Sequence, residues 1–593
     1  MASLDFDVLA FFKEEIRAET ASIKIGAVNR LHLIANALGP AKTVSELVPF
    51  LNQVIKEEPW CDDEEFLYCV AKQYAVLTEY INGQYTLLIG ALGHLAAQEE
   101  TAIRDQAICS LRVIVEKKPS LVPEHVVPIL DHLMSKSDFF TSRVSACALL
   151  PTAYPHADEQ QKAELRKSYE KLCSDDTPMV RRAAAHNLCA FVAVCDRQDL
   201  LRDMVQVYRQ LSQEDTQDTI RVTCVHTTLV LARMFSPEDN KAHTVQVIQE
   251  ASEDRSWRVR LTVAKNFDQL CSAFGPEITS TCLMEAFKLL IKDSEQEVRK
   301  EAIRVIEPML KLQSTHPNMA EALQRDVLPL FSNLAVDSAQ PVRAALAQVL
   351  GPMAKALGRD VTQRQLLPQI ADLMKDEFSD VRLNIVSQVG LICEVLTVEG
   401  LVHSLLHTIQ SLATDNHWRI RQSVAEQVPK LAKLFGVEMF QAKLETLFLA
   451  SLRDCVHSVR QAAILHLKDI ADTFGPQWTV EHWLPKIIDH YSQSAGYANR
   501  VTTLHGLPQV SHLMTPDQVV QHIVPILIKA TKDSVPNVRF CACQTIEWVL
   551  ENHNLSAASV ETIRRTLTEL EQDSDIDVLY FASRALAKCG HSH

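Results

Sequence analysis

Hydrophobic residues along this chain recur at helical spacing in short, paired segments. From Met284 to Ile291 the apolar positions follow an i, i+3, i+4 pattern, and a second apolar stripe runs from Val298 to Ile306. Asp293 lies between the two stripes. We therefore predict two amphipathic helices joined by a short turn, which is a helical hairpin.

Local signals place the start of the second helix of a hairpin. Ser294 and Glu297 reproduce the S-x-x-E capping box, which predicts that this helix starts at Ser294. In another copy Pro178 follows Thr177, and proline is favoured in the first turn of a helix. The turn between the two helices is therefore encoded locally.

One pattern recurs along the chain, an aspartate followed five positions later by Val or Ile and then Arg. The successive arginines are mostly 39 or 40 residues apart. The nine copies are Asp175/Val180-Arg181, Asp215/Ile220-Arg221, Asp254/Val259-Arg260, Asp293/Val298-Arg299, Asp337/Val342-Arg343, Asp376/Val381-Arg382, Asp415/Ile420-Arg421, Asp454/Val459-Arg460 and Asp533/Val538-Arg539.

Degenerate copies complete the series. Arg500 fills the slot after Arg460 without its aspartate, and Asp573 with Val578 begins a last copy in which Leu579 replaces arginine. Weaker copies precede Asp175, the first of them around 23–28. Fifteen units of about 39 residues fill nearly all of the 593 positions, and no room remains for a separate catalytic domain.

This repetition predicts an all-α solenoid of about fifteen two-helix units over 1–593. Neither helix of a hairpin can bury its apolar stripe alone, so the units must stack. Stacking of similar units gives a curved rod with a continuous core and a long groove. The 47% hydrophobic content and the small number of glycines, 15, agree with helices.

Charge and targeting signals narrow the function class. The formal net charge of −15 argues against a protein that mainly binds nucleic acid or an anionic membrane face, and favours basic partners. No basic n-region precedes an apolar stretch, and no run of about 18 apolar residues occurs. We expect a soluble, unsecreted, cytoplasmic protein without membrane insertion, with the nucleus left open as a second compartment.

The cysteines indicate a reducing compartment and no metal site. Fifteen cysteines are scattered over apolar positions such as Cys109, Cys189, Cys271 and Cys393, which suggests buried thiols. The terminal sequence Cys589-Gly-His-Ser-His matches no standard zinc spacing. We predict no bound metal.

The recurring aspartate and arginine are best explained as structure. Nine equivalent copies cannot all be active sites, whereas a stacked solenoid needs a polar contact in each layer. We predict that each aspartate accepts backbone N–H groups in its turn and that each arginine pairs with the aspartate of a neighbouring unit. Exposed ion pairs of this kind are worth about 0–1 kcal/mol each.

Two turns carry tryptophan. Trp257 with Arg258 and Trp418 with Arg419 occupy the same place in their units. Tryptophan and arginine are enriched at binding hot spots. The alternative is that each indole packs between adjacent turns, and the spacing alone does not decide between the two.

Catalytic patterns are absent from the sequence. Phosphate-binding glycine loops, H-E-x-x-H, G-x-S-x-G and C-x-x-C do not occur. We predict no catalytic residues and no cofactor.

The repeats resemble a known family. The hairpins are similar to HEAT repeats, and the whole series resembles the scaffolding A subunits of protein phosphatase 2A. The turn sequences that carry the resemblance are 175–185, 253–260 and 378–385. The resemblance implies a horseshoe-like superhelix that binds one interchangeable regulatory B-type subunit together with the phosphatase 2A catalytic subunit.

The resemblance also implies where each partner binds. The catalytic subunit would occupy 398–593, repeats 11–15, and contact Trp418, Arg419, Tyr497, Arg500 and Asn537. The regulatory subunit would occupy 1–310, repeats 1–8, through Glu99, Glu100, Arg104, Pro178, Met179, Arg182, Trp257 and Arg258. The sequence departs from the family at His457, where the family tends to carry an aromatic residue, and from Gln544 onward.

Two other function classes stay open. A nuclear transport receptor or adaptor of the HEAT type would suit the acidic chain, although the repeats of such proteins are usually less uniform. An enzyme with a site spread over the concave face is the third class, and it would require turnover by the chain alone.

Overall fold

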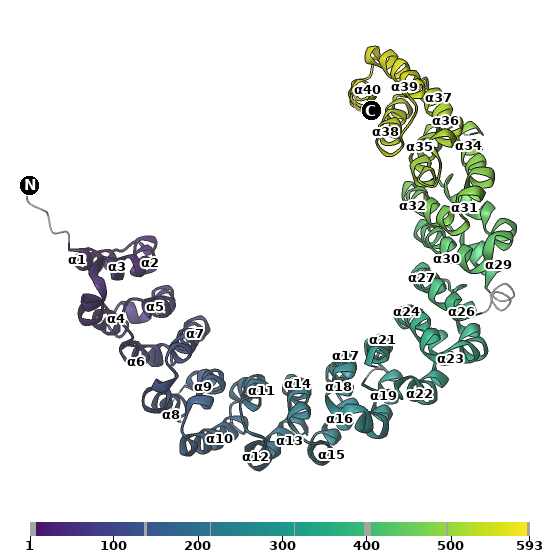
Figure 1. Cartoon of the computed structure of the whole chain (residues 1–593). Helices are drawn as coiled ribbons and strands as arrows, with labels where there is room; N and C mark the ends of the chain where they lie inside the picture. Colours follow the sequence, from purple (N-terminus) through teal and green to yellow (C-terminus); the bar gives the residue numbers. More distant parts are fainter. Residues whose placement is uncertain are drawn as a thin grey trace, which may run out of the picture. The chain divides into compact units, whose positions relative to one another are not determined.

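The computed structural model describes residues 7–135, 139–213, 215–312, 315–396, 405–493 and 496–589, and every regular element in these ranges is a helix (Figure 1). Contacts divide the chain into two compact units, residues 1–292 and 293–593. The boundary falls in the turn between helices α19 and α20. Each unit is described on its own.

The first unit contains α1 (Val8–Glu15), α2 (Ala21–Asn29), α3 (Leu31–Lys42), α4 (Val48–Val54), α5 (Glu64–Leu77), α6 (Thr86–Leu95), α7 (Thr101–Lys117), α8 (Val127–Met134), α9 (Phe140–Ala153), α10 (Glu159–Cys173), α11 (Pro178–Val192), α12 (Arg197–Asp199), α13 (Val205–Gln213), α14 (Asp218–Met234), α15 (Pro237–His243), α16 (Val245–Ser252), α17 (Trp257–Lys265), α18 (Phe267–Ile278) and α19 (Met284–Ile291).

The second unit contains α20 (Gln296–Arg304), α21 (Ile306–Lys311), α22 (Met319–Asp326), α23 (Phe331–Ala335), α24 (Gln340–Leu357), α25 (Arg359–Val361), α26 (Leu367–Leu373), α27 (Ser379–Val395), α29 (Leu406–Leu412), α30 (Trp418–Lys443), α31 (Glu445–Ser451), α32 (His457–Phe474), α33 (Pro476–Trp478), α34 (Leu484–Gln493), α35 (Tyr497–Ser511), α36 (Pro516–His522), α37 (Val524–Ala530), α38 (Pro536–Asn552), α39 (Ala557–Glu569) and α40 (Ile576–Cys589).

The predicted hairpins are confirmed. Seven second helices in the first unit (α2, α5, α7, α9, α11, α14 and α17) and eight in the second (α20, α24, α27, α30, α32, α35, α38 and α40) make fifteen over the described residues. Second helices pack on second helices, as α9 does on α11 and α27 on α30, and first helices pack on first helices, as α13 does on α16. Each unit is therefore a two-layered stack of hairpins, which is the predicted α-solenoid.

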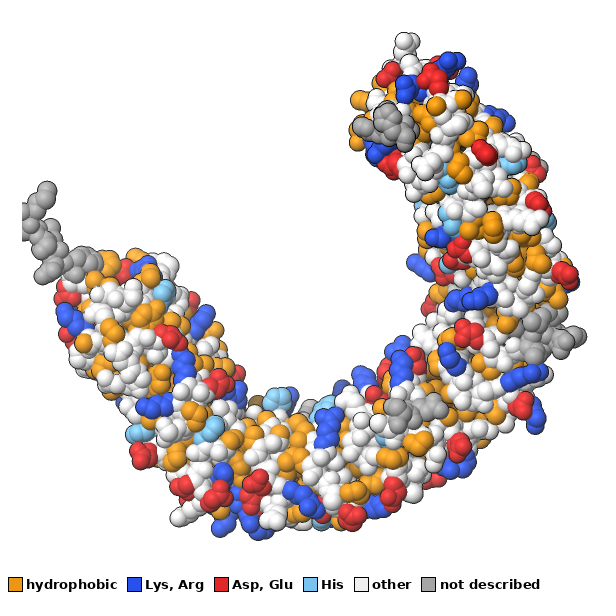
Figure 2. Space-filling model, viewed as in Figure 1, with side chains coloured by type: hydrophobic (Ala, Val, Ile, Leu, Met, Phe, Trp, Pro, Cys, Tyr) orange, Lys and Arg blue, Asp and Glu red, His pale blue; other side chains and the backbone are white. Residues whose placement is uncertain are grey.

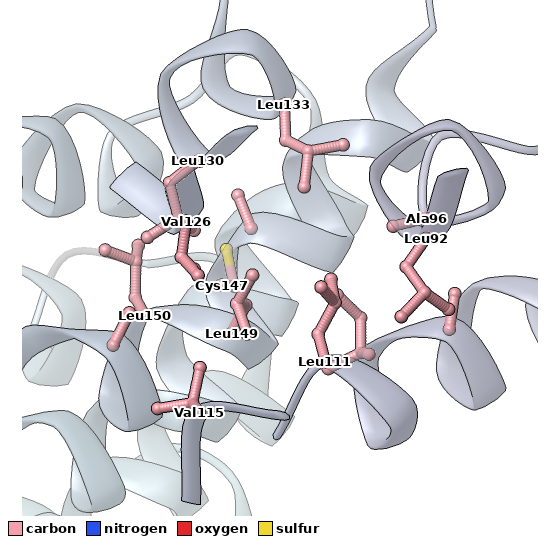
Figure 3. Packing of buried hydrophobic residues seen from close by; sticks show 14 of the residues in the cluster. Leu92, Ala96, Leu111, Val115, Val126, Leu130, Leu133, Cys147, Leu149 and Leu150 are labelled. Atoms are coloured by element: carbon pink, nitrogen blue, oxygen red, sulfur yellow. The ribbon is translucent and has the colours of Figure 1, made fainter. Parts of the chain in front are cut away.

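The core lies between the two layers of hairpins. In the first unit one apolar cluster extends from Leu9 to Val247. Figure 3 shows part of it, where side chains from four successive segments meet: Leu92 and Ala96, Leu111 and Val115, Val126, Leu130 and Leu133, and Cys147, Leu149 and Leu150. Each hairpin thus buries its apolar stripes against its neighbours, as repeat proteins must.

The turn within each hairpin is built around the recurring aspartate. In ten turns, Oδ1 of the aspartate accepts the backbone N–H two residues later at 2.7–2.9 Å, from Asp175 to Asp573. This local bond competes with helix formation. The second helix accordingly begins three residues after the aspartate, for example at Pro178 after Asp175, as predicted.

The predicted capping box at Ser294 is wrong. Helix α20 begins at Gln296, and its N-cap is Glu295, whose side chain caps nothing. Asp293 explains the shift, because its carboxylate accepts the N–H of Glu295 at 2.8 Å and the Ser294 hydroxyl turns back to donate to it at 3.4 Å. The aspartate turn therefore overrides the local capping signal.

Arginine–aspartate pairs join successive turns into a ladder, as predicted. In each pair Nε of the arginine donates to Oδ2 of the next aspartate at 2.6–3.0 Å. The bonded pairs are Arg143–Asp175, Arg181–Asp215, Arg221–Asp254, Arg299–Asp337, Arg343–Asp376, Arg382–Asp415, Arg421–Asp454, Arg500–Asp533 and Arg539–Asp573.

The same arginines also close their own turns. Nη1 of Arg343 donates to the carbonyl of Asp337, six residues earlier, at 2.7 Å, and Arg421 does the same to Asp415 at 2.8 Å. No ladder side chain is more than 21% exposed. The expectation of weak, exposed bridges is therefore wrong, since removing one partner would leave the other charge largely buried and unpaired.

A second motif links one hairpin to the next, and sequence analysis missed it. Gly39, Gly275, Gly358 and Gly475 have φ values of 76–87°, which only glycine adopts at little cost. Four residues after each glycine a buried threonine donates its hydroxyl to the glycine carbonyl at 2.8–2.9 Å. The signal is G-x-x-x-T, which recurs in the sequence but less often than the Asp-Arg pattern.

Gly475→Ala should therefore destabilise the fold by about 1–2 kcal/mol, because a Cβ is costly at positive φ. The matched control is Gly90→Ala, on an exposed face of α6 where a Cβ meets no atom. That change should stabilise by about 0.5–1 kcal/mol. Urea unfolding measures both, and equal effects of the two changes would contradict the account.

The ladder also predicts acid sensitivity. Hydrogen bonds from Arg539 hold the pKa of Asp573 below its ordinary value. Burial raises the pKa of Asp376, but hydrogen bonds from Arg343 outweigh it, so that pKa is lowered as well. The unfolded carboxyl titrates near about 3.9. The stabilisation is therefore complete above about pH 5 and is lost as the pH falls through the folded pKa.

Asp573→Asn should cost about 1–3 kcal/mol at pH 7, because the variant leaves a largely buried guanidinium without its carboxylate. The difference from the wild type should shrink between about pH 5 and pH 3, as the wild-type carboxyl becomes protonated. Urea midpoints across this range measure it. A difference that does not depend on pH would count against a charged ladder.

Candidate protein-binding turns

One residue in each turn is free of the ladder. The first residue of each second helix lies three positions after the aspartate slot, and its side chain makes no ladder bond. This position holds Pro178, Trp257, Trp418, His457 and Tyr497. Four of the predicted contact residues thus share one structural position, which the ladder holds at the edge of the stack.

Trp257 and its neighbours form a small organised surface in the first unit. The indole is 38% exposed, and the Arg258 guanidinium lies 5.3 Å from its ring centre. Arg258 also reaches Asp218 of the preceding hairpin at 3.3 Å, and the Ser256 hydroxyl donates to the same carboxylate at 2.9 Å. Hydrogen bonds from Ser256 and Arg258 lower the pKa of Asp218. The indole is exposed on one side and backed by a cation.

Trp418 repeats this arrangement in the second unit. The Arg419 guanidinium lies 4.6 Å from the indole centre, within the range of a cation–π contact. Trp418 is half-buried and Arg419 is exposed. Both tryptophans are therefore partly packed and partly accessible. Packing between adjacent turns and binding of a partner are both compatible with this arrangement.

The other residues predicted to contact a regulatory subunit lie on two turns of the first unit. Glu99 and Glu100 are exposed before α7, where the Glu100 carboxylate accepts the N–H of Ala102 at 3.4 Å. Pro178, Met179 and Arg182 are exposed at the start of α11, with Met179 at 53%. These side chains are accessible to a partner.

Arg104 differs, and the prediction that it contacts a partner does not fit its burial. Its side chain is 5% exposed and donates to the carbonyls of Gln98, at 2.9 Å, and Glu99 and to the Thr101 hydroxyl at 3.1 Å. Burial lowers its pKa. Arg104 occupies the ladder position of its hairpin and shapes the acidic turn from within.

Arg500 is likewise a ladder residue. Its guanidinium donates to both carboxylate oxygens of Asp533, at 2.7 and 2.9 Å. Tyr497, one turn before it, is 51% exposed, and Asn537 of α38 is exposed as well. Of the residues predicted to contact a catalytic subunit, Trp418, Arg419, Tyr497 and Asn537 thus offer accessible side chains, whereas Arg500 holds the turn.

Tyr497 and Asn537 open onto one groove in the second unit. The groove has a volume of about 480 Å³ and is lined by residues of α32, α35 and α38. Its walls include residues that the sequence did not indicate: Arg460, Leu465, His505 and Phe540. Leu465 is 56% exposed and lies on the same side of α32 as His457 and Arg460. The helical spacing of these three residues could have indicated a shared surface in the sequence.

The histidines of the groove are close together. Desolvation, with a smaller effect from His457, lowers the pKa of His505. Its Nε2 lies 3.5 Å from the Cys541 sulfur. In the part of the chain that the structure describes, no group of three or more His, Cys, Asp or Glu side chains is placed to hold a metal ion. His591 and His593 lie outside the described residues.

The cysteines are mostly buried, as expected. All fifteen cysteines are free thiols, and most are buried, but Cys109 is exposed and Cys189 only half-buried, so the expected burial is wrong at these two positions. Over the described ranges, no helix is both long and apolar enough to cross a membrane. Figure 2 shows acidic, basic and hydrophobic side chains interspersed over the visible face of each unit.

Comparison with family models and known proteins places these turns in context. Residues 276–358 match a model described as PPP2R1A-like HEAT repeat, and residues 165–195 match the general HEAT repeat model. The human 65 kDa regulatory A subunit of serine/threonine-protein phosphatase 2A, in its beta isoform, is 36% identical over 359 residues, which cover 60% of this chain and 58% of that one.

Two other relatives agree. The regulatory A subunit of protein phosphatase PP2A from Schizosaccharomyces pombe is 34% identical over 279 residues, 46% of each chain. The Dictyostelium discoideum protein phosphatase 2A scaffold subunit is 36% identical over 293 residues, 49% of each chain. The matched segments thus span about half the length of these relatives.

Solved structures support the fold alone. The crystal structure of Kap121p superposes with a TM-score of 0.63 at 11% identity, over 93% of this chain and 57% of that one. A Kap95p complex with RanGDP gives a TM-score of 0.57 at 11% identity, over 98% of this chain and 83% of that one. With its stacked hairpins, its two HEAT matches and its 34–36% identity to these relatives, the chain is a HEAT-repeat protein related to the regulatory A subunits of protein phosphatase 2A.

Proposed function

We propose that this chain is a non-catalytic scaffold that assembles a protein phosphatase 2A holoenzyme. The catalytic subunit would bind the turns within 398–593, through Trp418, Arg419, Tyr497 and Asn537. An interchangeable regulatory B-type subunit would bind the turns within 1–310, through Glu99, Glu100, Pro178, Met179, Arg182, Trp257 and Arg258.

One observation carries this proposal. Trp257, Trp418 and Tyr497, the accessible first residues of their second helices, stand on turns that the ladder fixes, in a chain whose relatives are named regulatory or scaffold subunits of this phosphatase. Exposed tryptophan and tyrosine beside arginine are the residues most enriched at interface hot spots. Rigid presentation of such residues lowers the entropic cost of binding.

The scaffold would act through geometry. A regulatory subunit that has captured a substrate is held beside the catalytic subunit, so the second encounter becomes intramolecular. Effective concentrations in the millimolar range are typical of such linkage. Arg104 and Arg500 contribute indirectly, since each holds the turn from which the contact residues project.

A nuclear transport role has less support. The likeness to Kap121p and Kap95p is at 11% identity and concerns the fold alone, whereas the sequence relatives are phosphatase subunits. Capture of a small GTPase instead of a phosphatase by the full chain would favour the transport role.

Affinity purification of variants tests the scaffold. The double change Trp418→Ala, Arg419→Ala should weaken binding of the phosphatase 2A catalytic subunit by at least about 30-fold, which corresponds to about 2 kcal/mol at a hot spot. Mass spectrometry of the co-purified proteins, followed by titration with the purified subunit, measures the effect.

The matched control is Trp257→Ala, Arg258→Ala, which removes the same pair of residues from the first unit. This control should lose regulatory subunits but retain the catalytic subunit. If neither the wild type nor the control captures a phosphatase, the scaffold proposal fails.

A further inference from the structure

Among the described residues, Arg460 of α32 lacks a ladder carboxylate on the side of α35. Nε of Arg460 donates to the Thr502 hydroxyl at 3.1 Å, and Nη1 donates to the carbonyls of Asp454, at 2.7 Å, and Cys455, at 3.2 Å. Among the described residues no carboxylate pairs with this guanidinium, and Nη2 has no hydrogen-bond partner. Arg460 therefore keeps the bonds to its own turn and lacks the bond to the next.

Thr502 replaces the missing aspartate only in part. Its own hydroxyl proton is donated to the Ala498 carbonyl at 2.8 Å, so its oxygen accepts from Arg460 as a neutral group. A carboxylate would accept two parallel bonds, as Asp454 does from Arg421 at 2.6 and 2.8 Å. Charge-assisted, bidentate pairs are roughly twice as strong as neutral hydrogen bonds.

The open side of Arg460 faces the groove described above. Arg460 lines this groove with His457, Tyr497, His505 and Asn537, and no aspartate or glutamate is among the lining residues. This local balance is opposite to the net charge of −15 of the whole chain. The groove is thus a locally cationic site on an acidic protein.

The remaining walls of the groove are apolar. Ile464 and Leu465 of α32 and Phe540 of α38 line it, and Leu465 is 56% exposed. An extended protein segment that carries a carboxylate next to an apolar side chain matches both properties. A free inorganic anion would match only the first.

We propose that this groove binds an aspartate or glutamate side chain of the docked phosphatase 2A catalytic subunit, and that this carboxylate completes the ladder by pairing with Arg460. The proposal rests on the scaffold function above. It makes Arg460 a partner-binding residue, and it explains why one turn lacks the aspartate that its neighbours carry.

Binding of the purified catalytic subunit to the immobilised full chain tests the pair. Arg460→Gln should weaken binding about tenfold or more, and the salt dependence of binding should decrease. The matched control is Arg343→Gln, which removes a ladder arginine that has its own carboxylate, Asp376, at 2.6 Å, between turns outside 398–593. The control should lower thermal stability and leave binding unchanged.

A restoring change gives a second readout. Position 494 stands six residues before Arg500, as Asp533 stands six before Arg539, although Ser494 itself lies outside the described residues. Ser494→Asp should raise thermal stability and weaken subunit binding, because an internal carboxylate would compete for Arg460. Ser492→Asp adds the same charge to the exposed end of α34 and should do neither.

Zero-length cross-linking identifies the carboxylate. With R460K, carbodiimide should form an amide between the introduced amine and an aspartate or glutamate of the catalytic subunit, found by peptide mass spectrometry. Equal affinities of the wild type and of Arg460→Gln for the subunit would overturn this inference alone. A cross-link only to this chain's own carboxylates would also overturn it, and a wild-type chain that binds no catalytic subunit would overturn the scaffold function as well.

Discussion

The bond between each arginine and the aspartate of the next turn is the interaction on which the rest of this structure depends. One guanidinium closes its own turn through backbone carbonyls and reaches the next turn through a carboxylate, as Arg343 does with Asp337 and Asp376. The hydrophobic core provides most of the stability but is not directional. The ladder supplies the direction, because it fixes how far each hairpin is shifted against its neighbour.

That constraint explains where binding residues can lie. The aspartate and the arginine of each turn are committed to the ladder, and the valine or isoleucine beside the arginine is buried, so the first position of the second helix is left to vary. Trp257, Trp418 and Tyr497 occupy it. A scaffold needs contact side chains that vary from turn to turn and a turn backbone that stays the same. The ladder and the variable first position provide both.

Much of the fold could be predicted from the sequence, because its period is regular and its turn chemistry is local. The hairpins, the start of α11 at Pro178 and the pairing of the ladder follow from the Asp-Arg spacing. The start of α20 could not be predicted in this way. The Asp293 carboxylate competes with Ser294 for the role of organising the turn, and only the structure shows that Asp293 accepts the Glu295 N–H. The burial of Arg104 was missed although Ile103-Arg104 is a weaker copy of the repeat, because Gln98 stands in the aspartate slot and the family resemblance implied that Arg104 contacts a partner.

The candidate site was predicted less completely. Aromatic residues such as Trp418 and Tyr497 are visible in the sequence as departures from the repeat. The groove beside them is not, because it depends on three helices from different repeats and on a partner that Arg460 lacks. The missing aspartate before Arg500 is visible in the sequence as a departure from the repeat, and the structure adds that Arg460 is the group left without a carboxylate.

The most direct test of the account is an experimental structure of the full chain bound to the phosphatase 2A catalytic subunit. The account predicts that the subunit lies against the first turns of α30, α32, α35 and α38, with one of its carboxylates within hydrogen-bonding distance of Arg460. A subunit seated on other turns, or a groove without that carboxylate, would contradict it.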